Sequence, residues 1–333
     1  MAAETFKAFW VEEVAKNEYK RSIIERKVAD LPEGDLLIKV HYSSLNYKDA
    51  LSAVGNKGVT RNFPHTPGID AAGEVVSCES GRFAAGDRVL VTGYDLGMNT
   101  HGGYGQYIRI PSEWAIPLPA GLTLKETMIL GTAGFTAALS VWKMQQGGVA
   151  PGDGDILVTG ATGGVGSIAV SILARAGYRV VAATGKMSEK AFLEGLGAAE
   201  VISRDEVMAG AERPMMKTRW AGAIDVAGGD TLAAVLKATN YGGVVTCCGL
   251  VGSPDLSVNV FPFILRGVSL IGIDSVECPM GPRLEVWKKL ASDWKPEQLE
   301  QTASACTLEG LEEKIEQIMK GQIRGRTLVD MQA

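Results

Sequence analysis

The sequence has few of the residues that form disulfide bonds or hold metal ions. It contains five cysteines and three histidines among its 333 residues. The cysteines are odd in number, lack regular spacing and form no C-x-x-C pair, which argues against a disulfide framework and against a structural zinc site. We therefore expect reduced thiols, no bound metal and a cytoplasmic location.

Long apolar runs are also missing. One uncharged, largely apolar run lies between Glu126 and Lys143 and is interrupted by glycines and threonines. It is shorter than the ~20 residues that a membrane-spanning helix needs. The first 20 residues mix charged with apolar side chains, unlike a signal peptide. We expect neither a membrane span nor a membrane partner.

Positive charge is not in excess. Lysine and arginine number 33 against 38 aspartates and glutamates, a net charge of −5. This balance argues against a nucleic-acid partner, which would require a concentrated basic face. Glycine is abundant instead, with 41 residues, and this favours tight turns and close backbone approaches in a ligand-binding α/β protein. The length corresponds to about two domains.

Two patterns follow one another along the chain. Up to residue 121, short β-rich stretches such as 36–42, 71–77 and 88–92 alternate with turns. This predicts a compact, barrel-like β unit. From residue 122, apolar strands alternate with helical segments, beginning with a helix at 124–144 and a strand at 155–159. The alternation predicts an α/β domain with a doubly wound parallel sheet.

The strongest motif is a glycine-rich turn between the strand at 155–159 and the next helix. It reads A-x-G-x-x-G, with Ala161 at the position of the first glycine in the usual pattern. Gly163 would let the backbone approach a pyrophosphate, and Gly166 would let the helix pack closely on the sheet. Free N–H groups at the helix N-terminus attract an anion. The motif predicts dinucleotide binding; the alternative is an ordinary glycine-rich turn.

Charge predicts which dinucleotide binds. An NAD enzyme places a carboxylate about 20 residues beyond the glycines, where it binds the ribose 2′-hydroxyl. Here that place holds Thr184, Gly185 and Lys186, without an acid. A hydroxyl, a free N–H and an ammonium all favour a 2′-phosphate, and Arg204 after the next strand would add a guanidinium. We therefore predict NADPH as the cofactor; the alternative is that both cations are solvated surface charges.

Several stretches together resemble the medium-chain dehydrogenase/reductase superfamily. Within it the chain is similar to the zinc-free, NADPH-dependent acryloyl-CoA reductase group, whose members are often labelled quinone oxidoreductases. The resemblance covers essentially the whole chain and rests, besides the glycine turn, on stretches 43–51, 63–70, 131–136, 262–266, 272–275 and 325–329.

The resemblance implies a GroES-like catalytic domain at 1–121 and 299–333 and a Rossmann NADPH-binding domain at 122–298. Zinc-dependent relatives carry a catalytic cysteine in the stretch that here runs from Asn46 to Asp49, and a Gly-His-Glu segment where this chain has Gly68, Ile69 and Asp70. The expected zinc ligands are therefore missing, and alcohol oxidation in the zinc-dependent manner is not expected.

The implied reaction is reduction of an activated double bond. Hydride would add to the β-carbon of an enoyl thioester, and a proton would reach the α-carbon. Tyr47 is the candidate catalytic residue, because the matching tyrosine of the family lies beside the nicotinamide and a phenol keeps its proton near neutral pH. Packing at a strand end is the alternative role for Tyr47. Asn46 and Asp49 are undecided between structure and catalysis.

The resemblance also implies further cofactor contacts, a homodimer and an acyl-CoA substrate. The contacts besides Tyr47 would be Thr162, Gly163, Gly164, Val165, Leu250, Ile273, Ser275 and Arg326, each with packing as its alternative. An NADPH:quinone oxidoreductase and a non-catalytic NADPH-binding protein remain the alternative functions. The residues alone do not distinguish a thioester from a quinone substrate.

Overall fold

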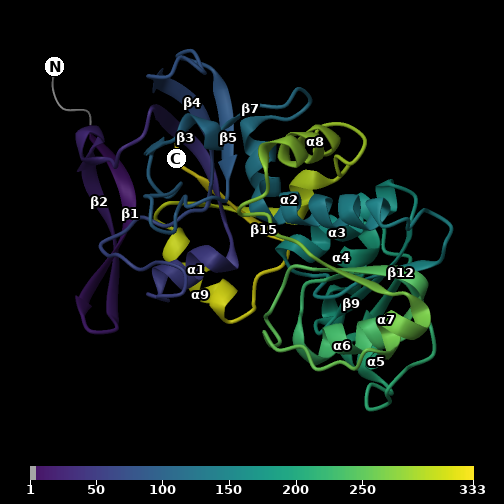
Figure 1. Cartoon of the computed structure of the whole chain (residues 1–333). Coiled ribbons are helices and arrows are strands. Elements are labelled where there is room, and N and C mark those ends of the chain that lie inside the picture. The colour runs from purple at the N-terminus through teal and green to yellow at the C-terminus, as the bar shows by residue number, and fades with distance from the viewer. Residues whose placement is uncertain (1–4) are drawn as a thin grey trace. The chain divides into compact units, whose positions relative to one another are not determined.

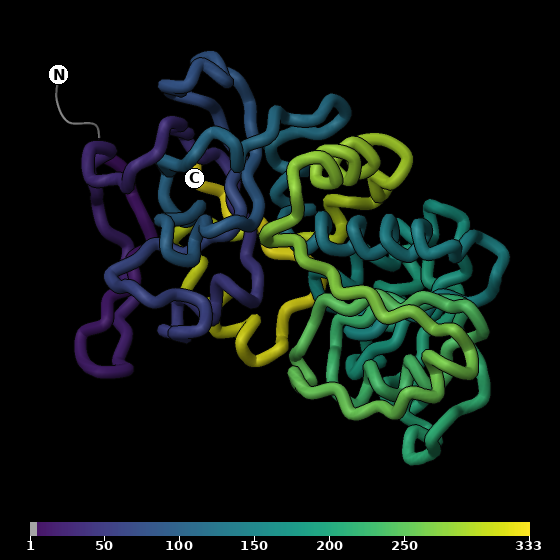
Figure 2. The backbone as a smooth tube through the Cα atoms, viewed as in Figure 1, coloured from purple at the N-terminus to yellow at the C-terminus, as the bar shows by residue number. Residues whose placement is uncertain are grey.

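The computed structural model describes residues 5–333 and divides into two compact units. The first comprises Met1–Thr132 and Leu299–Ala333, and the second Ala133–Gln298. Figure 2 shows the yellow C-terminal part of the backbone returning to the purple and blue N-terminal part, which together make the first unit. The two ends of the sequence thus build one unit around an inserted second unit.

The first unit is built on a seven-stranded sheet with the order β14-β15-β3-β4-β5-β7, and β6 pairs with β3. Its strands are β3 (Leu36–Leu45), β4 (Asp70–Cys78), β5 (Arg88–Thr92), β6 (Tyr107–Ile110), β7 (Ile116–Pro117), β14 (Ala303–Thr307) and β15 (Arg326–Asp330). In Figure 1 the yellow strand β15 enters this unit, where it pairs antiparallel with β3. Buried apolar side chains of both chain ends share one core.

The sequence predicts neither the N-terminal hairpin nor the first α-helix of the first unit. Strands β1 (Thr5–Ala15) and β2 (Glu18–Lys27) form an antiparallel hairpin. Helix α1 (Tyr47–Ala53) follows β3 directly, and α9 (Leu311–Met319) lies near it. A helix can begin at Tyr47 because the Asp49 carboxylate accepts the backbone N–H of Asn46, the residue that caps the helix.

The second unit contains a six-stranded sheet with the order β10-β9-β8-β11-β12-β13. These strands are β8 (Asp155–Val158), β9 (Arg179–Thr184), β10 (Glu200–Ser203), β11 (Trp220–Asp225), β12 (Thr239–Cys247) and β13 (Ser269–Gly272), and all their pairings are parallel. The apolar runs predict such strands because a parallel sheet is covered on both faces. The doubly wound sheet is confirmed.

Helices connect the strands of this sheet. They are α3 (Gly164–Arg175), α4 (Lys190–Gly195), α5 (Arg204–Met208), α6 (Gly229–Ala238) and α7 (Phe261–Arg266), followed by α8 (Met280–Leu290). Helix α2 (Leu124–Gln146) contains a break at Gly131, where φ is 53° and ψ is −158°. Because Thr132 ends the first unit, the two parts of α2 belong to different units.

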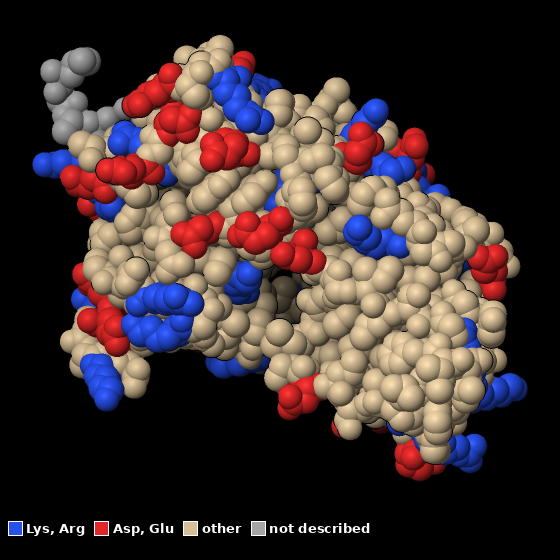
Figure 3. All heavy atoms as spheres, viewed as in Figure 1, with Lys and Arg blue, Asp and Glu red and all other residues tan. Residues whose placement is uncertain are grey.

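Charges of both signs are interspersed on the surface. On the face drawn in Figure 3, blue and red side chains alternate over the described residues without a broad field of one sign. Within residues 5–333, no helix combines the length and the apolar character that crossing a membrane would require.

Candidate cofactor and active site

The glycine-rich turn joins β8 to α3 as the motif predicts. Gly160 has a φ of 57°, and its carbonyl accepts the N–H of Gly163 at 3.0 Å. A Cβ atom on Gly166 would lie 2.4 Å from the Gly160 oxygen and 2.7 Å from the Ala161 Cα. Only glycine therefore allows α3 to pack this closely on the turn.

The N-terminus of α3 presents free backbone N–H groups. Gly164 and Val165 begin the helix, and Gly163 caps it without a side chain. A Cβ on Gly163 would contact only the Gly160 oxygen, at 3.4 Å, so the backbone there is open to a ligand. The Thr162 hydroxyl lies 3.3 Å from that of Thr184. The turn fits a pyrophosphate, which helix N–H groups bind.

The predicted 2′-phosphate residues lie at two neighbouring strand ends. Thr184 ends β9 and pairs with Ser203 at the end of β10. The Lys186 N–H donates to the Thr184 hydroxyl at 2.9 Å. Arg204 reaches toward the same place, since a Cβ on Gly185 would lie 3.1 Å from its Nη2 atom. The structure thus brings the Thr184 hydroxyl, Gly185, the backbone of Lys186 and the Arg204 guanidinium together.

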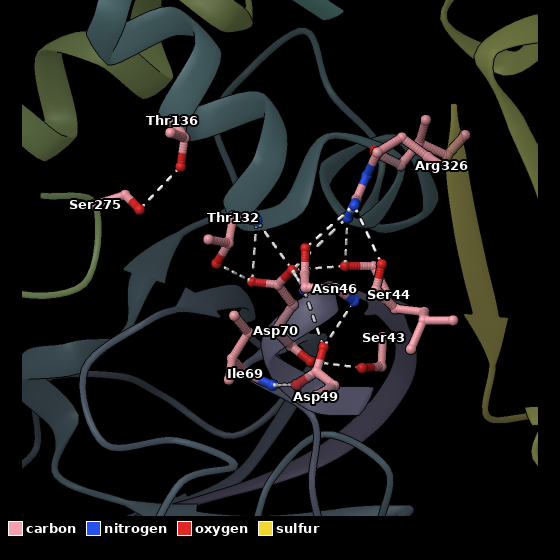
Figure 4. A network of polar contacts seen from close by, with 12 residues as sticks. Ser43, Ser44, Asn46, Asp49, Ile69, Asp70, Thr132, Thr136, Ser275 and Arg326 are labelled. Atoms are coloured by element: carbon pink, nitrogen blue, oxygen red, sulfur yellow. Dashed lines mark hydrogen bonds and ion pairs between the residues drawn. The ribbon is translucent and has the colours of Figure 1, made fainter. Parts of the chain in front are cut away.

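The remaining candidates of the second unit follow the next strand ends. Leu250 is 63% exposed and lies beyond β12, and the Ile273 N–H donates to Cys247 just past β13. The Ser275 hydroxyl accepts a hydrogen bond from Thr136 at 2.9 Å, as Figure 4 shows. Together with the turn, these residues lie at the carboxyl ends of parallel strands, where such sheets bind ligands.

Tyr47 is the first residue of α1 and is 40% exposed. The residue before it is held firmly. The Asn46 amide donates to the carboxylates of Asp49 and Asp70, at 3.1 and 2.8 Å. Asp49 also accepts the Ile69 N–H at 2.8 Å. These bonds fix the start of α1 and leave the Tyr47 ring exposed.

Arg326 lies inside the first unit. It is 3% exposed, and its guanidinium donates to the carbonyls of Ile129 and Leu45. It also donates to the side-chain amide oxygen of Asn46 at 3.1 Å and to the Ser44 hydroxyl at 2.8 Å, as Figure 4 shows. A buried guanidinium with these acceptors organises the polar network rather than presenting itself to a nucleotide. We therefore propose a structural role for Arg326 in place of the expected cofactor contact.

Burial shifts the pKa values of this network. It raises the pKa of Asp49 to about 7, with the charge of Asp70 as the next cause. It lowers the pKa of Arg326, an effect that Asp70 and Asp49 oppose. Near neutral pH, Asp49 is therefore partly protonated. The Arg326 guanidinium lies 3.9 Å from the Asp70 carboxylate.

Several residues of this network are not signalled by a motif. Asp70 accepts the Ser44 hydroxyl at 2.6 Å and both the N–H and the hydroxyl of Thr132. A Cβ on Gly131 would lie 2.5 Å from the Asp70 carboxylate, so glycine is required at the break in α2. In the sequence, Asp70 stands out only as part of stretch 63–70 and as the residue at the place of a zinc-family glutamate.

Asp225 is a second buried carboxylate that sequence reasoning missed. It ends β11 and accepts the Thr159 hydroxyl and the Gly228 N–H, both at 2.7 Å. Burial raises its pKa. These bonds shape the loops at the carboxyl edge of the sheet. The signal in the sequence is the run 223–226, followed after Ala227 by Gly228 and Gly229.

The described part of the chain contains no group of side chains suited to bind a metal ion. Within residues 5–333, no three His, Cys, Asp or Glu side chains are grouped to hold a metal ion. At the places where zinc-dependent relatives have ligands, the Asn46 side-chain amide instead donates to Asp49 and Asp70 and accepts a hydrogen bond from Arg326. The zinc-free site stays a prediction.

Two family models match the chain. Residues 32–120 match the alcohol dehydrogenase GroES-like domain, and residues 164–292 match the zinc-binding dehydrogenase domain. These matches fall within the first and the second unit, respectively.

Individual relatives match over nearly the whole chain. YhfP of Bacillus subtilis (strain 168), whose name assigns it provisionally to the quinone oxidoreductases, is 48% identical over 303 residues, 91% of this chain and 92% of that protein. Acrylyl-CoA reductase AcuI of Ruegeria pomeroyi is 43% identical over 312 residues, 94% of each chain.

Solved structures show the same fold. The yhdH oxidoreductase of Salmonella enterica, in complex with NADP, has a TM-score of 0.94 and 45% identity, covering 97% of this chain and 99% of that one. B. subtilis yhfP with NAD bound has a TM-score of 0.96 and 46% identity, covering 98% and 100%. The two neighbours were thus solved with different nicotinamide nucleotides.

Proposed function

The chain belongs to the medium-chain dehydrogenase/reductase family, and we propose that it is an NADPH-dependent reductase of the enoyl thioester acryloyl-CoA. The product would be propanoyl-CoA. The choice of substrate follows the relative named acrylyl-CoA reductase, to which the chain is similar over 94% of its length.

One observation carries the choice of cofactor. Lys186 follows the end of β9, with its backbone N–H on the Thr184 hydroxyl, and Arg204 follows the end of β10, where an NAD enzyme has a carboxylate. A dianionic 2′-phosphate is attracted by both cations, whereas a 2′-hydroxyl gains little from them. The Salmonella neighbour solved with NADP supports this choice.

The residues of the turn would hold the rest of the cofactor. Thr162, Gly163, Gly164 and Val165 surround the N-terminus of α3, where N–H groups bind the pyrophosphate. Leu250, Ile273 and Ser275 line the edge at which the nicotinamide would rest. When bound there, the reduced nicotinamide supplies a hydride for the β-carbon of the thioester.

Tyr47 is proposed to act on the substrate. Negative charge develops on the thioester oxygen as the β-carbon accepts the hydride, and a positioned hydroxyl stabilises that oxygen. The Tyr47 hydroxyl would donate a hydrogen bond to it or pass a proton toward the α-carbon. The capped start of α1 and the buried network behind it support such a fixed position.

A quinone reductase is the second candidate, favoured by the name of the B. subtilis relative. Steady-state rates with acryloyl-CoA, crotonoyl-CoA and 1,4-benzoquinone, each with NADPH and NADH, separate the candidates. We expect the highest kcat/KM for acryloyl-CoA with NADPH. A many-fold preference for the quinone would reverse the substrate choice, and tight NADPH binding without turnover would indicate a binding protein.

The assembly and location are part of the same proposal. We propose a homodimer that acts in the cytoplasm on a small-molecule acyl-CoA. Sedimentation equilibrium at micromolar concentration measures the mass of the particle: about twice the 35.2 kDa of one chain is expected, and a single-chain mass would contradict the dimer.

A further inference from the structure

A buried arginine donates several hydrogen bonds to the segment that follows β13. Arg283 lies in the first turn of α8 and is 1% exposed. Its guanidinium donates to the backbone carbonyls of Ser275, Val276 and Cys278, at 3.2, 3.0 and 3.3 Å. One side chain therefore donates hydrogen bonds to three backbone carbonyls of the loop that follows β13.

The guanidinium is itself held in place by aromatic rings. It lies 5.0 Å from the centre of the Phe135 ring, which stacks on Trp287 with ring centres 6.1 Å apart. Arg283 and Trp287 are four residues apart on α8, so they lie on the same face of the helix. Phe135 belongs to α2, next to Thr136, whose hydroxyl donates to Ser275. Two elements thus hold the segment at Ser275.

A second arginine of the same unit makes a similar set of bonds elsewhere. Arg266, at the end of α7, donates to the carbonyls of Lys237, Thr239 and Met216, at 2.8, 3.2 and 2.8 Å. Thr239 begins β12, and Met216 precedes β11. Arg266 therefore secures the amino edge of the parallel sheet, whereas Arg283 secures the carboxyl edge, where ligands bind.

We propose that Arg283 is a positioning residue for the nicotinamide half of the cofactor. It acts through the 273–278 segment: by pairing three carbonyls, it keeps Ile273 and Ser275 in one arrangement before the cofactor arrives. A preorganised contact surface strengthens binding because less freedom is lost on association. The adenosine half binds at β8, β9 and β10, far along the strand order, and does not depend on Arg283. The inference rests on the proposed binding of NADPH.

Lysine at position 283 keeps the charge but loses the planar fork that reaches several carbonyls. The test compares Arg283→Lys with the matched control Arg266→Lys, using isothermal titration of two ligands. NADPH carries the nicotinamide, and adenosine 2′,5′-bisphosphate lacks it. For Arg283→Lys we expect the Kd of NADPH to rise about tenfold while that of the bisphosphate stays within about twofold. For Arg266→Lys the ratio of the two Kd values stays that of the wild type.

The ratio distinguishes positioning from general stability. Equal weakening of both ligands by Arg283→Lys, or an unchanged NADPH Kd, would overturn the inference. If Arg283→Lys does not fold, Thr136→Val, which removes the other tether of Ser275, must shift the ratio in the same direction, and an unchanged ratio overturns it. Wild-type protein that binds the bisphosphate but not NADPH would overturn the inference; binding of neither would overturn the proposed function as well.

Discussion

Replacing Arg326 with methionine should strongly destabilise the first unit. The substitution keeps the side-chain stem but removes four hydrogen bonds, to Ile129, Leu45, Asn46 and Ser44. It also leaves the fully buried Asp70 without its cation at 3.9 Å. Asp70 keeps its bonds from Ser44, Asn46 and Thr132, so the loss is that of one partner of a buried pair. We expect the free energy of unfolding to fall by about 3–5 kcal/mol.

Urea unfolding measures this loss, provided that wild type and variant are compared at the same pH and their transitions have similar slopes. Arg324→Met is the matched control, because Arg324 is exposed and lies two residues earlier; its effect should stay within about 0.5 kcal/mol. A loss below about 1 kcal/mol for Arg326→Met would refute the buried network as an organising feature of the unit.

Three further substitutions test the site and its unit. Tyr47→Phe should lower kcat for acryloyl-CoA by about 10²-fold without changing NADPH affinity, because a positioned proton donor is lost. The control is Tyr241→Phe, since Tyr241 is 84% exposed. Full activity of Tyr47→Phe would show that the hydroxyl serves only packing. Lys186→Ala should raise the KM for NADPH about tenfold and the KM for NADH less than twofold. Lys190→Ala is the control. Equal effects on the two nucleotides would contradict a role of Lys186 in binding the 2′-phosphate. Burial lowers the pKa of His65 to about 4, so the folded chain keeps this imidazole neutral while the unfolded chain protonates it below about pH 6.5. The stability that depends on the neutral imidazole is therefore present above that pH and falls on acidification. Between pH 7 and 5, the free energy of unfolding of His65→Gln should fall by about 2 kcal/mol less than that of the wild type. Urea unfolding at each pH measures it, and an equal fall for both proteins would contradict the prediction.

The parallel sheet was predictable because its signals are local. The strand expected at 155–159 is β8 (Asp155–Val158). Apolar runs bounded by turns are typical of strands that a parallel sheet buries on both faces. The glycine spacing likewise placed the turn between β8 and α3, since steric requirements at Gly166 are met within a few residues.

The polar network was not predictable because its members are distant in sequence. Arg326 bonds to Asn46 across 280 positions, and Asp70 bonds to Thr132 across 62. No periodicity or spacing joins such residues. The same holds for the break in α2, where a continuous helix was expected at 124–144. Gly131 has a positive φ, and a Cβ atom there would meet the Asp70 carboxylate and the Ser44 hydroxyl, so both the conformation and the space require glycine.

The hairpin of β1 and β2 had a signal that went unused. Burial alternates over the first four residues of β1, where Phe6 and Ala8 are buried and Thr5 and Lys7 are exposed. This is the two-residue period of a half-buried strand. The charged residues of the first 20 positions argue against a signal peptide, and none of those that belong to this strand is buried.

Isotope transfer tests the central claim most directly. NADPH carrying deuterium at both C4 positions of the nicotinamide is incubated with acryloyl-CoA and the protein in ordinary water, and the propanoyl-CoA formed is examined by NMR. We predict one deuterium on the β-carbon. The α-carbon should carry none, because its new proton comes from groups that exchange with the water. Deuterium on the α-carbon, or no propanoyl-CoA above the rate without protein, would contradict the account.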